Sequence, residues 1–136
     1  MGIVKPLHVG ISVKSIEEAT AWYMKNLGFK PVSEAFYATP LKAKLCFLRR
    51  GDFEIEFFEH DDKKPLPGDR LSPNEDIRTI GTKHVAFLID DYDSMKKSFL
   101  KNGVDIAHEV QMGGDQVMFI RDNSGVLIEL ICSNPE

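Results

Sequence analysis

Two histidines and two glutamates occupy equivalent points of a sequence unit that occurs twice in the chain. His8 opens one run of alternating apolar residues, and His84 opens a similar run in the second half. Glu56 and Glu129 each interrupt a later apolar run, at nearly the same separation from the histidine of the same half. An ionised carboxylate in an apolar run is costly unless it is paired or bound to a metal. We therefore predict that the four residues bind a divalent metal ion.

The donor types limit which metals fit and suggest what the site does. Imidazole nitrogen and carboxylate oxygen suit Zn²⁺, Ni²⁺, Fe²⁺, Co²⁺ or Mn²⁺, and the spacing does not choose among these ions. Four protein ligands leave places in an octahedral shell for water or substrate. The ion would polarise a substrate oxygen, and Glu56 or Glu129 would serve as the catalytic base.

Taken singly, each of these residues has a simpler explanation. A lone histidine in a strand is more often a core or edge residue than a ligand, and Glu56 shares a side of its strand with Glu54, as on a solvated face. Glu129 is flanked on its own side by Leu127 and Ile131 and is harder to place at the surface. The matching positions of all four residues in the repeat favour the metal site.

The first half predicts one βαβββ module. A strand over 7–13 places His8, Gly10 and Ser12 on the face opposite its aliphatic residues. A helix then begins after Ser15, which forms a capping box with Glu18, and ends at Gly28. Three further strands are predicted over 29–37, 43–49 and 53–59.

The second half repeats the order, which predicts an α+β fold. A strand over 84–89 and a helix over 92–102 that stops at Gly103 are followed by strands over 105–110, 116–121 and 126–132, with Gly113-Gly114 as a hairpin turn. We predict one domain over 1–136, in which modules 6–60 and 82–133 form a cup-shaped mixed sheet around a metal-binding cleft. The polar segment 61–81 is the expected linker.

Composition excludes several classes of protein. The chain has 136 residues, of which 43% are hydrophobic, and a net charge of −4, so a nucleic-acid partner is not expected. No run reaches the length of a membrane span, and the first residues lack the apolar core of a signal peptide. Cys46 and Cys132 lie in apolar strands and are expected to be reduced. We expect a cytoplasmic protein with no membrane partner.

Several segments resemble the vicinal oxygen chelate superfamily. The resemblance extends over nearly the whole chain and rests on the duplicated histidine strand and on three segments: Trp22–Phe29, Gly81–Phe87 and Phe119–Leu130. The superfamily includes glyoxalase I, methylmalonyl-CoA epimerase, extradiol dioxygenases, and fosfomycin and bleomycin resistance proteins. By this resemblance, the chain is identified as a glyoxalase-like member, and four residues match the His-Glu-His-Glu ligand set of bacterial glyoxalase I: His8, Glu56, His84 and Glu129.

The resemblance also implies a reaction class. In such isomerases and lyases the metal holds two substrate oxygens while a glutamate moves a proton on the adjacent carbon, so Glu129 and Glu56 are the implied bases. The arginine and asparagine that contact glutathione in glyoxalase I correspond here to Ser12 and His60. Glutathione hemithioacetal is therefore not supported as the substrate, and Ser12 and His60 are only weak candidates for substrate contact.

Two other functions stay open. An Fe²⁺ dioxygenase of the extradiol type would use His8, His84 and Glu129 as its triad, with Glu56 beside it, whereas a resistance-type protein would bind a small molecule without turnover. Both metal glutamates are present, which favours proton transfer in an enzyme. Family members of this length often form homodimers, in some of which two chains share a site, so we expect a homodimer. His60 and His108 have no partner in the repeat, and His108 is expected at the surface.

Overall fold

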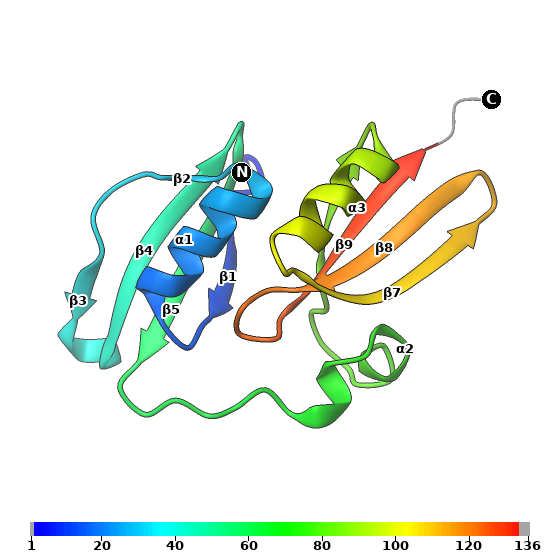
Figure 1. Cartoon of the computed structure of the whole chain (residues 1–136). Helices are drawn as coiled ribbons and strands as arrows, with labels where there is room; N and C mark the ends of the chain where they lie inside the picture. Colours follow the sequence, from blue (N-terminus) through cyan, green and yellow to red (C-terminus); the bar gives the residue numbers. More distant parts are fainter. Residues whose placement is uncertain (1, 134–136) are drawn as a thin grey trace. The chain divides into compact units, whose positions relative to one another are not determined.

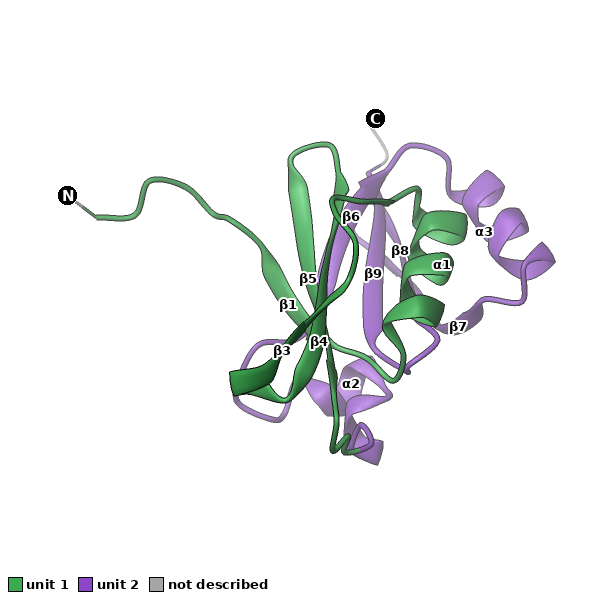
Figure 2. Ribbon diagram, turned by 90° about the vertical axis from the view of Figure 1, so that its left-hand side faces the viewer, with its two compact units in different colours: residues 1–64 green, residues 65–136 purple. Residues whose placement is uncertain are grey.

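The computed structural model describes residues 2–133, and the chain divides between residues 64 and 65 into two compact units (Figure 2). Each unit contains one β-sheet and one long helix (Figure 1). The α+β class and the repeated βαβββ order predicted from the sequence are confirmed. Each unit also carries its own half of the predicted ligand set.

The sheet of the first unit has mixed strand directions. Its strands follow the order β1 (Val9–Ser12), β5 (Phe53–His60), β4 (Ala43–Arg50) and β2 (Lys30–Pro31), and β3 (Phe36–Ala38) also pairs with β4. β1 runs parallel to β5, and the other pairs are antiparallel. A short 3-10 helix, η1 (Thr39–Leu41), links β3 to β4.

The strand predicted over 29–37 is wrong as a continuous element. Val32 still donates its N–H to the carbonyl of Phe47 at 2.8 Å, but residues 33–35 leave β4 before β3 begins. Pro31 has no N–H to give to the ladder, and proline is typical of strands at a sheet edge. The edge of this sheet is therefore divided into β2 and β3.

Helix α1 (Ile16–Leu27) packs on one face of the first sheet (Figure 1). The Ser15 hydroxyl accepts a hydrogen bond from the N–H of Glu18 at 3.2 Å, as the capping pattern predicts. The helix ends at Gly28, whose φ of 73° lies in the left-handed region. Tyr23 is buried and meets the ring of Phe57 edge-to-face at 5.0 Å, which joins helix and sheet in one core.

The second unit has the same order of strands and helix, but its edge strand is not divided. The sheet order is β6 (Val85–Ile89), β9 (Leu127–Ser133), β8 (Asp115–Arg121) and β7 (Asp105–Met112), with β6 parallel to β9 and the other pairs antiparallel. Helix α3 (Tyr92–Lys101) begins at Asp91, whose carboxylate accepts from the N–H of Ser94. The predicted turn at Gly113-Gly114 joins β7 to β8. Fully buried core side chains include Phe99, Met118, Ile120 and Leu130.

Residues 65–83, named the strap here, belong to the second unit and contain two short helices. These are η2 (Gly68–Arg70) and α2 (Pro73–Asp76), within the segment expected to be a linker. Figure 1 shows α2 at the end of the sheet where β8 finishes and β9 begins. Arg121 at the end of β8 donates from Nε to the carbonyl of Leu71 at 2.8 Å, which ties the strap to the sheet.

Helix length also bears on membrane contact. Among residues 2–133, no helix is both long enough and apolar enough to cross a membrane.

Candidate metal-binding site

The first unit brings His8 and Glu56 together. His8 lies one residue before β1, and Glu56 lies near the middle of the neighbouring strand β5. The Nε2 atom of His8 is 3.1 Å from Oε1 of Glu56, and the two side chains are 29% and 15% exposed. Both atoms are thus within direct reach of each other and partly open to a ligand.

The second unit brings His84 and Glu129 together in the same way. His84 lies one residue before β6, and Glu129 is the third residue of β9. Nε2 of His84 is 3.0 Å from Oε1 of Glu129, with side-chain exposures of 20% and 16%. The two pairs use the same atoms at nearly the same distance.

Strand register explains why the pairs are alike. Gly10, two residues after His8, is the parallel partner of Glu56. Ala86, two residues after His84, is the parallel partner of Glu129. Side chains alternate between faces along a strand, so histidine and glutamate emerge on the same face of each sheet at the same offset. The similar His–Glu separations in the two halves of the sequence therefore reflect the same strand register in the two sheets.

Each pair includes an aromatic ring that sequence reasoning missed. Phe47 is the cross-strand partner of Glu56 and packs edge-to-face on His8, with ring centroids 5.7 Å apart. Phe119 is the partner of Glu129 and packs on His84 at 5.0 Å. Each phenylalanine precedes the glutamate of its module by a similar number of residues, which is the signal that would have revealed it. The repeated feature is thus a Phe–His–Glu arrangement.

The donors and distances of each pair fit a divalent ion. Two donors at right angles in an octahedral shell, each about 2.1 Å from the ion, lie about 3.0 Å apart. The pairs measure 3.1 and 3.0 Å. The same separation also suits a hydrogen bond between imidazole and carboxylate, so each pair is satisfied without an ion. Within residues 2–133, the structure groups no three or more histidine, cysteine, aspartate or glutamate side chains at metal-binding distance.

The two weak candidates for substrate contact lie in the first unit. Ser12 is exposed at the end of β1, on the same face as Gly10. His60 ends β5, and its Nδ1 accepts from the N–H of Asp62 at 2.9 Å. This ring nitrogen is therefore already used in a local turn. His108, expected at the surface, is half-buried in β7.

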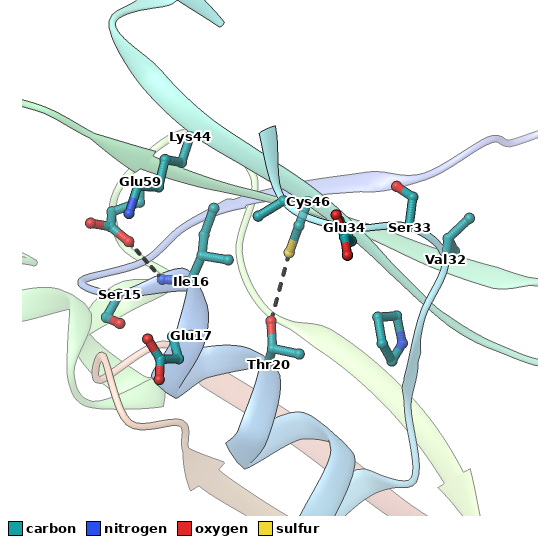
Figure 3. Close-up of a pocket in the computed structure, with 12 residues that line it drawn as sticks. Ser15, Ile16, Glu17, Thr20, Val32, Ser33, Glu34, Lys44, Cys46 and Glu59 are labelled. Atoms are coloured by element: carbon teal, nitrogen blue, oxygen red, sulfur yellow. Dashed lines mark hydrogen bonds between the residues drawn. The ribbon is translucent and has the colours of Figure 1, made fainter. Parts of the chain in front are cut away.

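A separate cavity of about 580 Å³ lies in the first unit between α1 and the strands β2 and β4 (Figure 3). Its walls include Thr20 of α1 and Cys46 of β4, whose Oγ1 and Sγ atoms are 3.6 Å apart. Cys46 and the ligand candidate Glu56 are on opposite faces, because Cys46 is next to Phe47, the cross-strand partner of Glu56. The cavity is thus separate from the His8–Glu56 pair.

Both cysteines are free, as predicted. Cys46 is buried, and burial raises the pKa of its thiol more than the contact with Thr20 lowers it. A thiol of raised pKa in an apolar wall is a poor nucleophile. Cys46 therefore fits a packing role.

Comparison with known proteins agrees with this architecture. The model of the glyoxalase/bleomycin resistance protein/dioxygenase superfamily matches residues 7–121. An uncharacterised protein of Bacillus subtilis, YwkD, is 26% identical over 98 residues, covering 72% of this chain and 71% of its own length.

Solved structures with the same fold come from several bacteria. A glyoxalase family protein from Enterococcus faecalis aligns with a TM-score of 0.78 at 20% identity, covering 96% of this chain and 99% of that one. A glutamate-to-glutamine mutant of the fosfomycin resistance protein FosX from Listeria monocytogenes, in complex with Mn(II) and 1S,2S-dihydroxypropylphosphonic acid, aligns with a TM-score of 0.69 at 18% identity, covering 95% and 92%. With its duplicated βαβββ modules and a family match over most of its length, the chain belongs to the glyoxalase/bleomycin resistance protein/dioxygenase superfamily.

Proposed function

We propose that this protein is a metal-dependent enzyme that moves a proton on a small oxygenated metabolite, as a glyoxalase-type lyase or isomerase or as an epimerase. The observation that carries the proposal is the Phe–His–Glu arrangement, present twice in the same register. We assign the ligands as His8, Glu56, His84 and Glu129, two from each module. The FosX complex with Mn(II) and a dihydroxylated phosphonic acid supports this class of ion and ligand.

The ion, the glutamates and the two phenylalanines would each have a separate role in the reaction. A bound divalent ion supplies a Lewis acid for substrate oxygens. The carboxylate of Glu129 or Glu56 accepts a proton from the neighbouring substrate carbon and returns it to that carbon or to the next one, so no proton is gained or lost overall. Phe47 and Phe119 restrict the histidine rings to one orientation and keep water from one side of each pair.

The equivalence of the glutamates favours proton transfer over the dioxygenase alternative. A triad of His8, His84 and Glu129 would leave Glu56 in a different role, yet both glutamates lie at the same offset from their histidines. Their exposures, 15% for Glu56 and 16% for Glu129, are also matched. Two equivalent His–Glu pairs support a four-residue ligand set.

Metal analysis of protein purified without a histidine tag tests the ligand set. After reconstitution with each of the five candidate ions and removal of free metal, one of them should remain at one ion per four-residue set. His8→Ala and His84→Ala should each release it, whereas His108→Ala, which changes a half-buried histidine outside the pairs, should retain it. Wild-type protein that retains no ion would contradict the proposal.

Isotope and oxygen measurements then separate the reaction classes. Deuterium from solvent should enter a 2-oxo or thioester substrate without oxygen uptake if a glutamate moves the proton. Oxygen uptake with a catechol and iron would instead establish the dioxygenase. Tight binding of a small molecule with neither signal would identify a resistance-type binding protein.

A further inference from the structure

The strap contains a buried carboxylate that the proposed reaction does not use. Two charged side chains among the described residues are buried, Asp76 and Asp122. Asp122 has a local role, because its Oδ1 accepts from the N–H groups of Ser124 and Val126 in the turn before β9. Asp76, whose side chain is 3% exposed, is tied instead to two cations.

Arg70, Asp76 and Lys83 form an ionic cluster, named the Asp76 clasp here. Nε of Arg70 lies 3.0 Å from Oδ1 of Asp76, and Nζ of Lys83 lies 3.2 Å from the same oxygen. Burial acts most strongly, to raise the pKa of Asp76, but the hydrogen bonds and positive charges of Arg70 and Lys83 together outweigh it and lower that pKa. The carboxylate is therefore ionised at neutral pH, and both cations stay attached to it.

The clasp holds the residues immediately before His84. Lys83 also donates from Nζ to the backbone carbonyl of Asp76 at 2.6 Å, and Arg70 donates from Nη2 to the carbonyl of Thr82 at 3.5 Å. On the other side of His84, Val85 begins β6 and pairs with Ile128. Adjacent Cα atoms are about 3.8 Å apart, so restraints on both neighbours leave the backbone of His84 little freedom.

We propose that Asp76 is a positioning residue that orients His84 against Glu129 before any ligand binds. This inference deepens the proposed function and relies on it only for the identity of what the pair binds. A pair that is already oriented loses less conformational freedom when an ion or substrate arrives. The clasp would therefore increase the affinity of the second module without touching the ligand.

The ring of His84 in metal-free protein gives a direct test. Nε2 of His84 lies 3.0 Å from the Glu129 carboxylate and the ring packs on Phe119, so the ring should keep one orientation, which ring ¹³C relaxation and NOEs to Phe119 report. Asp76→Asn removes the charge while keeping the shape, and should give the His84 ring more than one orientation. His8, in the other unit, should keep its spectrum and serves as the control within the same molecule.

Further variants separate positioning from a general loss of stability. Lys83→Met should reproduce the change at His84, and Lys83→Arg, which retains a cationic donor, should restore the wild-type spectrum. Glu109→Gln is a control for the loss of a bonded carboxylate elsewhere in the unit, because Glu109, although 36% exposed, also accepts from two side chains, Tyr92 at 2.6 Å and Lys96 at 3.0 Å. It contacts α3 and pairs with Met118, so it lies on the face opposite Phe119 and His84.

Mn²⁺ affinity gives a second readout. Loss of a group that orients a metal ligand typically lowers metal affinity by about 10- to 100-fold, which is the change expected for Asp76→Asn and not for Glu109→Gln. An unchanged His84 spectrum in Asp76→Asn and Lys83→Met, or an equal change in Glu109→Gln, would overturn the inference. If wild-type protein binds no metal, the proposed function fails while the ring spectra still decide whether Asp76 positions His84. If Asp76→Asn does not fold, Lys83→Met decides, since it leaves the Arg70–Asp76 pair intact.

Discussion

The two modules hold the same Phe–His–Glu arrangement but reach their histidines by different routes. His8 follows residues 2–7, which have no regular secondary structure, and Leu7 beside it is 67% exposed. His84 follows Lys83, which the Asp76 clasp holds. The His8 side chain is correspondingly more exposed, at 29% against 20% for His84.

This difference separates two tasks that a ligand pair requires. The distance between the donor atoms is nearly the same in both modules, so strand register alone is sufficient to set it. The clasp is present only beside His84 among these two pairs, so its contribution is to rigidity. One module can thus be used as the control for the other.

The glutamates should give the largest effect. Glu129→Gln and Glu56→Gln should each lower turnover by about 10²- to 10⁴-fold, because a carboxamide cannot accept the substrate proton. Circular dichroism should show that both variants keep the fold. Glu54→Gln is the matched control, since Glu54 lies on the same face of β5 and pairs with Arg49 at 2.8 Å. Retained turnover in either variant would exclude that glutamate as the base.

Asp76→Asn should have the largest effect on stability. Asp76 is buried, but the Arg70 side chain is 37% exposed and that of Lys83 is 19% exposed, so both cations regain part of their hydration when the charge is removed. The expected loss is therefore that of a buried polar group left without its partner, about 1–3 kcal/mol. Denaturant unfolding followed by a probe in the second unit measures this loss. A cost below about 1 kcal/mol, the range of exposed pairs, would show that the burial of Asp76 adds nothing to the strength of these ion pairs.

The stability that the clasp contributes should depend on pH in one direction. The folded-state pKa of Asp76 is lowered, so this contribution is complete above the unfolded pKa, about 3.9, and disappears as pH falls through the lower folded-state value. The difference in unfolding free energy between wild type and Asp76→Asn should be constant near neutral pH and shrink in acid. A difference that grows in acid would reverse the assigned sign.

The helix ends offer a smaller effect that should be equal in the two modules. Gly28 and Gly103 follow α1 and α3 with φ values of 73° and 70°. An added Cβ would meet nothing closer than the flexible Arg50 side chain at 3.5 Å in one case, and nothing within 4 Å in the other. Gly28→Ala and Gly103→Ala should therefore each cost about 1–2 kcal/mol from backbone strain alone. Unequal costs would reveal packing differences between the two ends.

The Arg49–Glu54 pair should give the smallest effect. The Arg49 side chain is 56% exposed, and exposed ion pairs contribute about 0–1 kcal/mol. Glu54→Gln should thus hardly change the unfolding midpoint, in contrast with Asp76→Asn. A large loss would show that exposure is a poor guide to ionic contributions in this protein.

Much of the fold followed from local patterns. The capping box at Ser15, the stop at Gly28 and the alternation in the strands depend on residues close in sequence, and each is present in the structure. The break at residues 33–35 was missed, because apolar content predicted one strand where an edge position and Pro31 allow the chain to leave the sheet.

Part of the candidate site was likewise predictable from the sequence, and part was not. Matching positions in the repeat identified the two His–Glu pairs, because parallel register converts equal spacing into equal geometry. That all four residues bind one ion remains a prediction. Phe47 and Phe119 were missed because edge-to-face contact with a histidine on another strand leaves no pattern among neighbouring residues; only their matching positions in the repeat could have revealed them.

The sequence by itself determined the two modules, the family resemblance and the residue types that chemistry would use, since these depend on periodicity and repetition along the chain. Only the tertiary structure showed that the strap carries a buried charge beside His84. Asp76 looks like an ordinary loop aspartate in the sequence, and it becomes structural because folding removes it from water and leaves Arg70 and Lys83 to balance its charge.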